Sequence, residues 1–429
     1  MAPSTDFPGK NWGKVDLATP RKEIVYDGNY YDVTDFIKRH PGGEQIMGYF
    51  AIPGEDATLA IQQFHARSFN KVEGIMKSLK SRPVTESPDD PLDKATREKN
   101  KALTEDFTKL YKELKAEGIF DPSYTHITYR IVELLVFTVV GLYIITQYPN
   151  TLGKCFGVIV LSMAQGRAIW IFHEGGHYSL TGNVSIDKRI QIYSSGIWIG
   201  FSGVYWRRSH SLHHAMANRL KRDADIETAP FFINNIKILN DPVKENNFLL
   251  RNQVKLSFFY GILADFNTRV VMSLASLLKY RVLEEFLAIG LHYVAAYYIG
   301  FWPWLFSNWI ALVYFAINLI LPHSHLPVTD QPTHWVEYGL VHTCDVEQRP
   351  WCDWWMGHLN YQIEHHLFPT MPQFKNKLIV GRVKALAEKH GLPYQVYSYK
   401  EAAVKSFKNL CDVGNQLRAL SKSKTLKNE

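Results

Sequence analysis

The sequence of 429 residues has only four cysteines: Cys155, Cys344, Cys352 and Cys411, with no C-x-x-C pair. A chain of this length does not need disulfide staples, so we expect reduced thiols rather than a disulfide framework. The N-terminal stretch MAPSTDFPGKNWGKVD lacks an apolar run. We therefore expect no cleaved signal peptide, and any membrane insertion must be internal.

Charged residues are scarce in four apolar stretches, although they make up 21% of the chain. The stretches cover residues 131–148, 153–172, 286–301 and 304–321. Each approaches the roughly 20 residues that cross a bilayer. They form two pairs with short uncharged connections, whereas Lys and Arg lie outside the pairs, which predicts that both termini are cytosolic. The alternative is a large helical core protein, which Glu133 and Arg167 inside the first two stretches favour.

Two further apolar segments are interrupted by Gly, Ser or charged residues. They cover residues 190–206 and 256–278. We interpret them as interfacial or half-buried helices rather than as spans.

The segment before the apolar stretches predicts a small mixed domain. Residues 24–26 and 30–33 flank Asp27-Gly28 and indicate a β-hairpin. Residues 81–91 are rich in Pro and acidic residues, which is typical of a linker. Residues 92–118 have apolar positions at helical spacing and predict a polar helix.

Three histidine clusters have the spacing of one helix face. They are His173 and His177 in HEGGH, His210, His213 and His214 in HSLHH, and Gln362, His365 and His366 in QIEHH. The predicted topology places all three on one side of the membrane. HEGGH also fits the zinc-protease pattern H-E-x-x-H, but a catalytic zinc takes three protein ligands and seven histidines are too many for it. We therefore predict two metals; imidazole suits iron, zinc and copper alike.

Further residues are candidates for this site. We expect His325 as an additional ligand, with His323, His342 and Gln362 as alternatives that the spacing cannot resolve. Three carboxylates could orient the imidazoles from behind: Glu174, Asp223 and Glu364. Asp223 and its neighbour Asp225 could equally be solvated charges, and Gln362 could be a hydrogen-bonding neighbour.

The N-terminal segment has a second kind of histidine pattern. His40 precedes Pro41-Gly42-Gly43, and His65 follows 25 residues later in an F-H context. Over roughly residues 20–80 this pattern resembles the cytochrome b5 haem domain. The resemblance implies that His40 and His65 are the two axial ligands of haem b.

Residues 125–400 resemble the membrane fatty acid desaturases with three histidine boxes, and HEGGHYSLTGN and NYQIEHHLFPTMP extend the match. Glu174 departs from the Asp that is more common there, but the carboxylate is kept. Together with the haem domain, Gln362 in the third box is typical of front-end desaturases. These enzymes insert a cis double bond between an existing one and the carboxyl end.

This resemblance implies the fold and the partners. We expect an α-helical integral membrane protein with about four transmembrane helices, interfacial helices and a cytosolic helical cap, and an N-terminal α+β domain. The expected division is residues 18–83 for the haem domain, 84–124 for linker and helix, 125–400 for the desaturase domain and 401–429 for a basic tail. Cofactors would be two iron ions and haem b. Partners would be a fatty acyl substrate on CoA or phospholipid, cytochrome b5 reductase and the bilayer, with no nucleic acid, at the endoplasmic reticulum membrane.

Several activities remain open. The main hypothesis is delta-5 or delta-6 acyl desaturation; delta-8 acyl desaturases, sphingolipid long-chain-base desaturases and hydroxylases share the same boxes. A membrane zinc peptidase would have no use for a haem domain. A membrane-tethered electron carrier would not require histidine-rich sets on one face. The surplus of Lys and Arg from Lys375 to Glu429, twelve against four Asp and Glu, suits anionic headgroups, an acidic partner or simply a solvated face.

Overall fold

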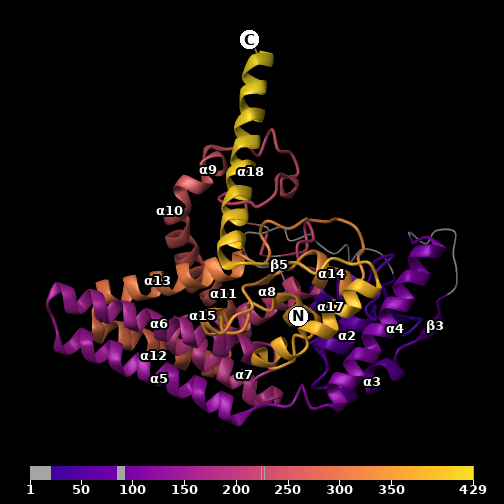
Figure 1. Ribbon diagram of the computed structural model, residues 1–429, viewed down its shortest axis with the longest axis horizontal. Helices are drawn as coiled ribbons and strands as arrows, with labels where there is room; N and C mark the ends of the chain where they lie inside the picture. The colour runs from indigo at the N-terminus through magenta and orange to yellow at the C-terminus, as the bar shows by residue number, and fades with distance from the viewer. Residues whose placement is uncertain (1–20, 85–91, 224, 227, 429) are drawn as a thin grey trace.

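The computed structural model describes residues 21–84 and 92–428, apart from residues 224 and 227 (Figure 1). The polar N-terminal stretch and most of the predicted linker, residues 85–91, lie outside the described residues. The protein is mostly helical, with one small sheet near the N-terminus and a two-stranded pairing near the C-terminus.

The N-terminal domain contains a three-stranded antiparallel sheet in the order β1-β2-β3 and a group of short helices. Its elements are β1 (Glu23–Tyr26), β2 (Asn29–Asp32), η1 (Ile37–Arg39), α1 (Glu44–Phe50), α2 (Thr58–Phe64), α3 (Phe69–Ser78) and β3 (Ser81–Pro83). Ile24 pairs with Tyr31 in the hairpin. Asp27 and Gly28 both have positive φ, 48° and 70°, as a type I′ turn requires. The predicted hairpin is confirmed.

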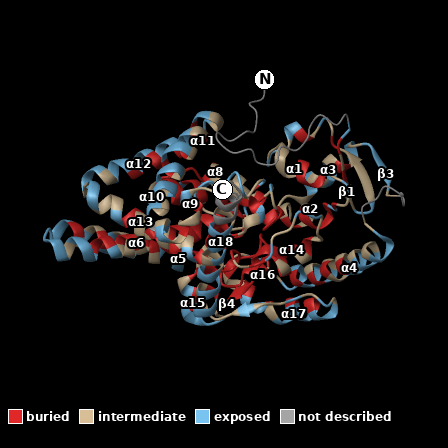
Figure 2. Ribbon diagram, turned by 90° about the horizontal axis from the view of Figure 1, so that it is seen from above, coloured by how far each residue is buried: buried red, intermediate tan, exposed pale blue. Residues whose placement is uncertain are grey.

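A layer of long helices forms the opposite end of the molecule (Figures 1 and 2). It consists of α5 (Tyr124–Gln147), α6 (Thr151–Gly176), α12 (Leu283–Ile299) and α13 (Phe301–Ile320). Gly141 lets α5 approach α6 closely, since a Cβ there would lie 2.9 Å from the Leu161 nitrogen. Large apolar side chains such as Val139 and Tyr297 are exposed on this layer, as expected for surfaces that face lipid.

Among the described residues, four helices are long and apolar enough to cross a membrane, and the third differs from the prediction. They are Tyr124–Gln147, Thr151–Gly176, Phe259–Tyr280 and Phe301–Ile320. Residues 256–278, predicted to be interfacial, thus supply a candidate span made of α10 (Gln253–Phe266), η4 (Asn267–Met272) and α11 (Ser273–Tyr280). Two of its charged residues, Asp265 and Arg269, pair one helical turn apart. The predicted third span, 286–301, corresponds to α12, whose 17 residues give a length of about 25 Å.

The remaining elements form a cap at one face of the helix layer and carry most of the predicted site. These are α4 (Lys94–Ala116), α7 (Val184–Tyr193), η2 (Ser194–Ile199), α8 (Gly203–Ala215), η3 (Ile236–Ile238), α9 (Phe248–Arg251), α14 (Trp335–Val341), β4 (Asp345–Val346), α15 (Pro350–Trp355), α16 (Gln362–Leu367), η5 (Gln373–Leu378), α17 (Val380–Lys389), β5 (Val396–Tyr397) and α18 (Tyr399–Asn428). The predicted polar helix of residues 92–118 is confirmed as α4. Its buried face packs on the rest of the cap, where Phe107 stacks on Phe368 with ring centroids 4.9 Å apart.

Candidate metal centre

The histidine clusters lie at the end of α6 and on the short helices α8 and α16, which the fold brings together. They supply His173, His177, His210, His213, His214, His365 and His366. The start of α8 is fixed by two side chains. The Ser202 hydroxyl accepts a hydrogen bond from the Tyr205 amide at 3.0 Å, and buried Glu285 accepts one from the Val204 amide at 2.8 Å. A carboxylate at a helix N-terminus stabilises the helix start, so the histidines of α8 are held in a defined direction.

A first cluster contains five buried histidines with ligand nitrogens within 4.8 Å of one another. They are His173, His177, His210, His214 and His365. His210 lies between two of the others, with its Nε2 3.0 Å from His173 Nε2 and 3.1 Å from His214 Nε2. Trp206 stacks on the His210 ring at 4.3 Å and limits its rotation.

A second cluster lies directly beside the first. It contains His213, His323 and His366, again within 4.8 Å. The Gln362 amide lies 3.0 Å from His323 Nε2, so its oxygen or nitrogen faces the same point. The two clusters touch where His214 of the first stacks on His366 of the second, with ring centroids 4.1 Å apart. This arrangement provides two neighbouring metal positions.

The charge state of these rings fits metal binding. Burial lowers the pKa of His177 and His323 to about 3, and it lowers the pKa of His365 and His366 well below the ordinary value. These rings are therefore neutral near pH 7 and keep a lone pair for a metal. Among the described residues, several of their buried nitrogens have no hydrogen-bond partner: His177 Nε2, His214 Nδ1, His365 Nδ1 and Nε2, and His366 Nε2. Such orphaned buried groups are costly unless something binds them.

Asp223 orients His213 from behind. Both of its carboxylate oxygens lie 3.0 Å from His213 Nδ1, and the Asn218 amide donates to it at 2.7 Å. Burial alone would lower the pKa of His213, but the charges of Asp223 and Asp225 more than offset this and raise it to about 9. The Asp223 contact directs Nε2 toward the second cluster, and a metal that binds there displaces a proton.

The other two predicted carboxylates contact the cluster indirectly. Glu174 accepts from the backbone amide of Gln373 at 3.0 Å, while the Gln373 side-chain amide contacts His173 Nδ1. Glu364 accepts from the Tyr394 hydroxyl at 2.8 Å, which also lies 2.9 Å from Asp345.

Asp345 connects the second of these carboxylates to α16. It accepts from the amide of Ile363 at 3.0 Å and so holds the start of the helix. Burial raises the pKa of Asp345 to about 6 and that of Glu364 well above its usual range. Neither Asp345 nor Gln373 was predicted from the sequence, because neither stands at helical spacing from a histidine of the three clusters.

Two of the candidate ligands lie outside both clusters. His325 Nδ1 lies 3.3 Å from the Ser406 hydroxyl, and its ring packs against Tyr397. His342 Nδ1 lies 2.8 Å from the Pro327 carbonyl. The geometry thus favours His323 over His325, because the turn after α13 directs His323 inward and His325 toward α18.

The glycines of HEGGH let α6 approach its neighbours closely. A Cβ on Gly175 would lie 2.8 Å from the Asp187 carbonyl oxygen, and one on Gly176 would lie 2.5 Å from the Trp206 ring. We expect Gly175→Ala to destabilise the protein by about 1–3 kcal/mol, because the obstructing atom belongs to the backbone of α7. Thermal unfolding of the purified protein in detergent measures this loss of stability.

Gly290→Ala is the matched control, since no atom of the described residues lies within 4 Å of a Cβ built at this helical position. Its stability should be unchanged or slightly increased. If both variants unfolded at the temperature of the wild type, close packing at Gly175 would not be a constraint.

Asp223 offers a graded test of ligand orientation. We expect Asp223→Asn to weaken metal affinity by about 10- to 100-fold, as for other carboxylates that orient a metal-binding histidine. Asp225 is exposed and lies farther from His213 Nδ1, at 3.6 Å. Asp225→Asn should therefore have the smaller effect in a chelator competition assay. Equal effects of the two variants would contradict the orienting role of Asp223.

The N-terminal domain brings its two predicted haem ligands close to each other. The rings of His40 and His65 have centroids 6.0 Å apart and an interplanar angle of 84°. His40 Nδ1 lies 3.1 Å from the Gly43 carbonyl, which leaves Nε2 available. Burial lowers the pKa of His65 to about 4, so its imidazole is neutral. Two half-buried neutral imidazoles across a gap fit bis-histidine haem ligation.

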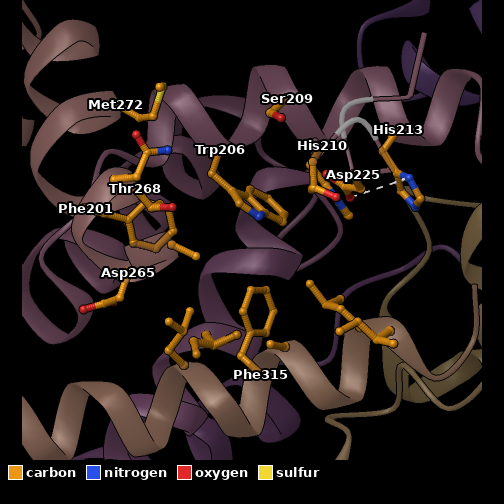
Figure 3. A pocket seen from close by; sticks show the side chains of 18 of the residues that line it. Phe201, Trp206, Ser209, His210, His213, Asp225, Asp265, Thr268, Met272 and Phe315 are labelled. Carbon is orange, nitrogen blue, oxygen red and sulfur yellow. Dashed lines mark ion pairs between the residues drawn. The ribbon is translucent and has the colours of Figure 1, made fainter. Parts of the chain in front are cut away.

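A cavity of about 440 Å³ opens beside the metal centre (Figure 3). Its wall is mainly apolar and aromatic, with Phe172, Phe201, Leu312 and Phe315 among the lining residues. Three histidines of the two clusters, His210, His213 and His323, also line it. The volume lies within the range of roughly 300–1,000 Å³ that is typical of ligand pockets, so an apolar ligand in it would lie next to the metals.

Comparison with known proteins gives matches over both parts of the chain. Residues 149–398 match the fatty acid desaturase family, and residues 19–85 match the cytochrome b5-like haem/steroid binding domain. An acyl-lipid (8-3)-desaturase of Rebecca salina is 38% identical over 410 residues, 92% of each chain. One of Thraustochytrium sp is 35% identical over 423 residues, 94% of each chain. Human fatty acid desaturase 3 is 28% identical over 428 residues, 96% of this chain and 91% of its own.

Proposed function

The chain belongs to the fatty acid desaturase family and is a front-end desaturase with a fused cytochrome b5-like domain, and we propose that it acts on polyunsaturated acyl chains at the delta-5 or delta-6 position. The observation that supports this proposal is the apolar cavity, which is lined in part by histidines of two adjacent clusters. A zinc peptidase would need neither the second cluster nor the haem domain.

The cofactors are two iron ions and haem b, as the two families imply. We propose that His173, His177, His210, His214 and His365 hold one iron, and that His213, His323 and His366 hold the other, with Gln362 beside them. His40 and His65 would hold the haem. When bound, the iron pair supplies oxygen activation and hydrogen removal from two adjacent methylene groups. The overall reaction removes two hydrogen atoms from the substrate. It consumes two further electrons and two protons and reduces one O₂ to two waters.

The chain's own residues contribute position and exclusion of water. Asp223 and Gln373 fix the ring orientation of His213 and His173. The aromatic wall at Phe172 and Phe315 keeps an acyl chain apart from solvent next to the metals. An unactivated C–H bond requires such a dry and preorganised site, because a reactive oxidant would otherwise be consumed by side reactions.

The family is membrane-bound and the substrate is a fatty acyl lipid. We further propose the endoplasmic reticulum membrane, with both termini and the histidine clusters on the cytosolic side, and cytochrome b5 reductase as electron donor. The charge bias of the loops supports this orientation. We also propose that the domain boundaries lie at residues 83, 124 and 400.

Product analysis tests the position of the new bond. Yeast that expresses the chain would be fed diunsaturated C18 and triunsaturated C20 acids, and the double bonds located by mass spectrometry. We expect a new cis bond at carbon 5 or carbon 6. A bond at carbon 8, or a product found only among sphingolipid long-chain bases, would contradict the assignment. An empty-vector strain is the control.

A further inference from the structure

The N-terminal domain shares one hydrophobic core with the helices that carry the metal ligands. The core cluster includes Tyr49 and Leu59 of the N-terminal domain together with Leu212 and Met216 near the histidines of α8 and Leu367 of α16. Domains joined by a flexible tether have separate cores. A continuous core instead indicates a fixed position of the haem domain behind α8 and α16.

A buried ion pair crosses this interface. The Glu55 carboxylate contacts the Arg219 guanidinium, and their side chains are only 2% and 3% exposed. Arg219 also donates to the Tyr338 hydroxyl at 2.9 Å. A buried charge that loses its partner strongly destabilises the protein. Undocking of the N-terminal domain would separate Glu55 from Arg219, so the ion pair stabilises the docked position.

A second set of contacts crosses the same interface three residues after Arg219, at Arg222. The Tyr49 hydroxyl donates to the Arg222 carbonyl at 2.9 Å, and the Arg222 guanidinium donates back to the Tyr49 carbonyl at 3.2 Å. Tyr49 is fully buried. These reciprocal bonds join α1 to the segment before Asp223, which orients a metal-binding histidine.

The third contact joins the two redox sites most directly. Arg208 donates to the carbonyl of Pro41 at 3.1 Å. Pro41 follows the haem ligand His40, and Arg208 lies on α8 two residues before the metal-ligand candidate His210. One hydrogen bond thus connects the loop of one site to the helix of the other.

We propose that the haem domain is locked in a single docked position by the Glu55–Arg219 ion pair, and that Arg208 is a positioning residue that holds the His40 loop against the metal-ligand helix. The kinetic consequence rests on the proposed function, whereas the docking itself does not. Docking fixes the separation of the two redox sites, on which the rate of electron transfer depends.

Hydrogen exchange of the full-length holoprotein in detergent tests the lock. In Arg219→Glu we expect exchange in peptides covering α1 and residues 216–223 to rise by about 100-fold, since a broken buried pair opens the interface. The haem absorption spectrum should stay unchanged. The exchanged pair Glu55→Arg/Arg219→Glu should recover most of the protection.

Arg82→Gln is the matched control. Arg82 pairs with Glu23 at 2.8 Å within the same domain, but on the exposed sheet, and its side chain is 48% exposed. This variant should exchange like the wild type. If Arg219→Glu exchanged like Arg82→Gln, or if the exchanged pair recovered nothing, the lock would be refuted.

Arg208→Gln tests the positioning role with less risk of misfolding, because its partner is a backbone carbonyl. We expect a normal haem spectrum and normal iron content, but reoxidation of the reduced haem by O₂ in the presence of substrate at least about tenfold slower. An unchanged reoxidation rate would overturn the role of Arg208. A wild type without desaturated product would refute the proposed function but leave the exchange result intact.

Discussion

Replacement of His366 by alanine is expected to reduce the desaturated product by more than about 100-fold while the haem spectrum stays normal. His366 lies in the second cluster with His213 and His323, and its ring stacks on His214 of the first. Its loss therefore removes one of the three histidines of the second cluster. It also removes the ring that stacks on His214 of the first cluster. Iron content per chain, corrected for haem iron, and product yield are the two measurements.

His325→Ala is the informative comparison for this experiment. The sequence favoured His325 as a ligand, whereas the structure places it against Ser406 and Tyr397. We expect this variant to keep its full iron content and His323→Ala to lose iron. If His325→Ala lost iron while His323→Ala kept it, the sequence-based choice would be right. Full iron content in His366→Ala would remove His366 from the site.

Replacement of His65 by alanine is expected to abolish the bis-histidine haem spectrum and to reduce turnover supported by the fused domain below detection. The half-buried ring of His65 lies 6.0 Å from that of His40, measured between ring centroids, and His40 alone leaves one axial position open. Non-haem iron should be unaffected, because His65 contributes nothing to either cluster. Optical spectra of the purified protein measure the change.

A histidine outside the haem site and both clusters provides the control for this second variant. His390 lies on the cap, where its Nε2 is 2.7 Å from Asp106. His390→Ala should show an unchanged haem spectrum. A normal spectrum in His65→Ala would refute the axial assignment, and loss of non-haem iron in the same variant would show that the two sites are not independent.

Local spacing predicted much of the site, because helix-face periodicity is a property of neighbouring residues. The pairs at α6 and α16 and the triplet on α8 needed only the i, i+3 and i, i+4 rule. The hairpin at Asp27-Gly28 was equally local. The four apolar stretches were also located from sequence, as α5, α6, α12 and α13.

Features that depend on how distant segments pack could not be predicted. His323 and His325 both lie in the turn after α13, which directs His323 toward the second cluster and His325 toward α18. Gln373 reaches His173 from 200 residues away, and Asp345 holds α16 through a backbone amide. The span at residues 259–280 was missed because interruptions by Gly, Ser or charged residues suggested an interfacial helix, whereas in the structure two of these charged residues, Asp265 and Arg269, pair with each other.

The central claim is that the two histidine clusters and the adjoining cavity desaturate an acyl chain. Lipid analysis of yeast that expresses the wild type, with His366→Ala alongside, tests it most directly. The wild type should form a new cis double bond between an existing one and the carboxyl end, and the variant should form none. Absence of any new double bond in the wild type, with every acyl substrate fed and with normal expression and haem content, would contradict the account.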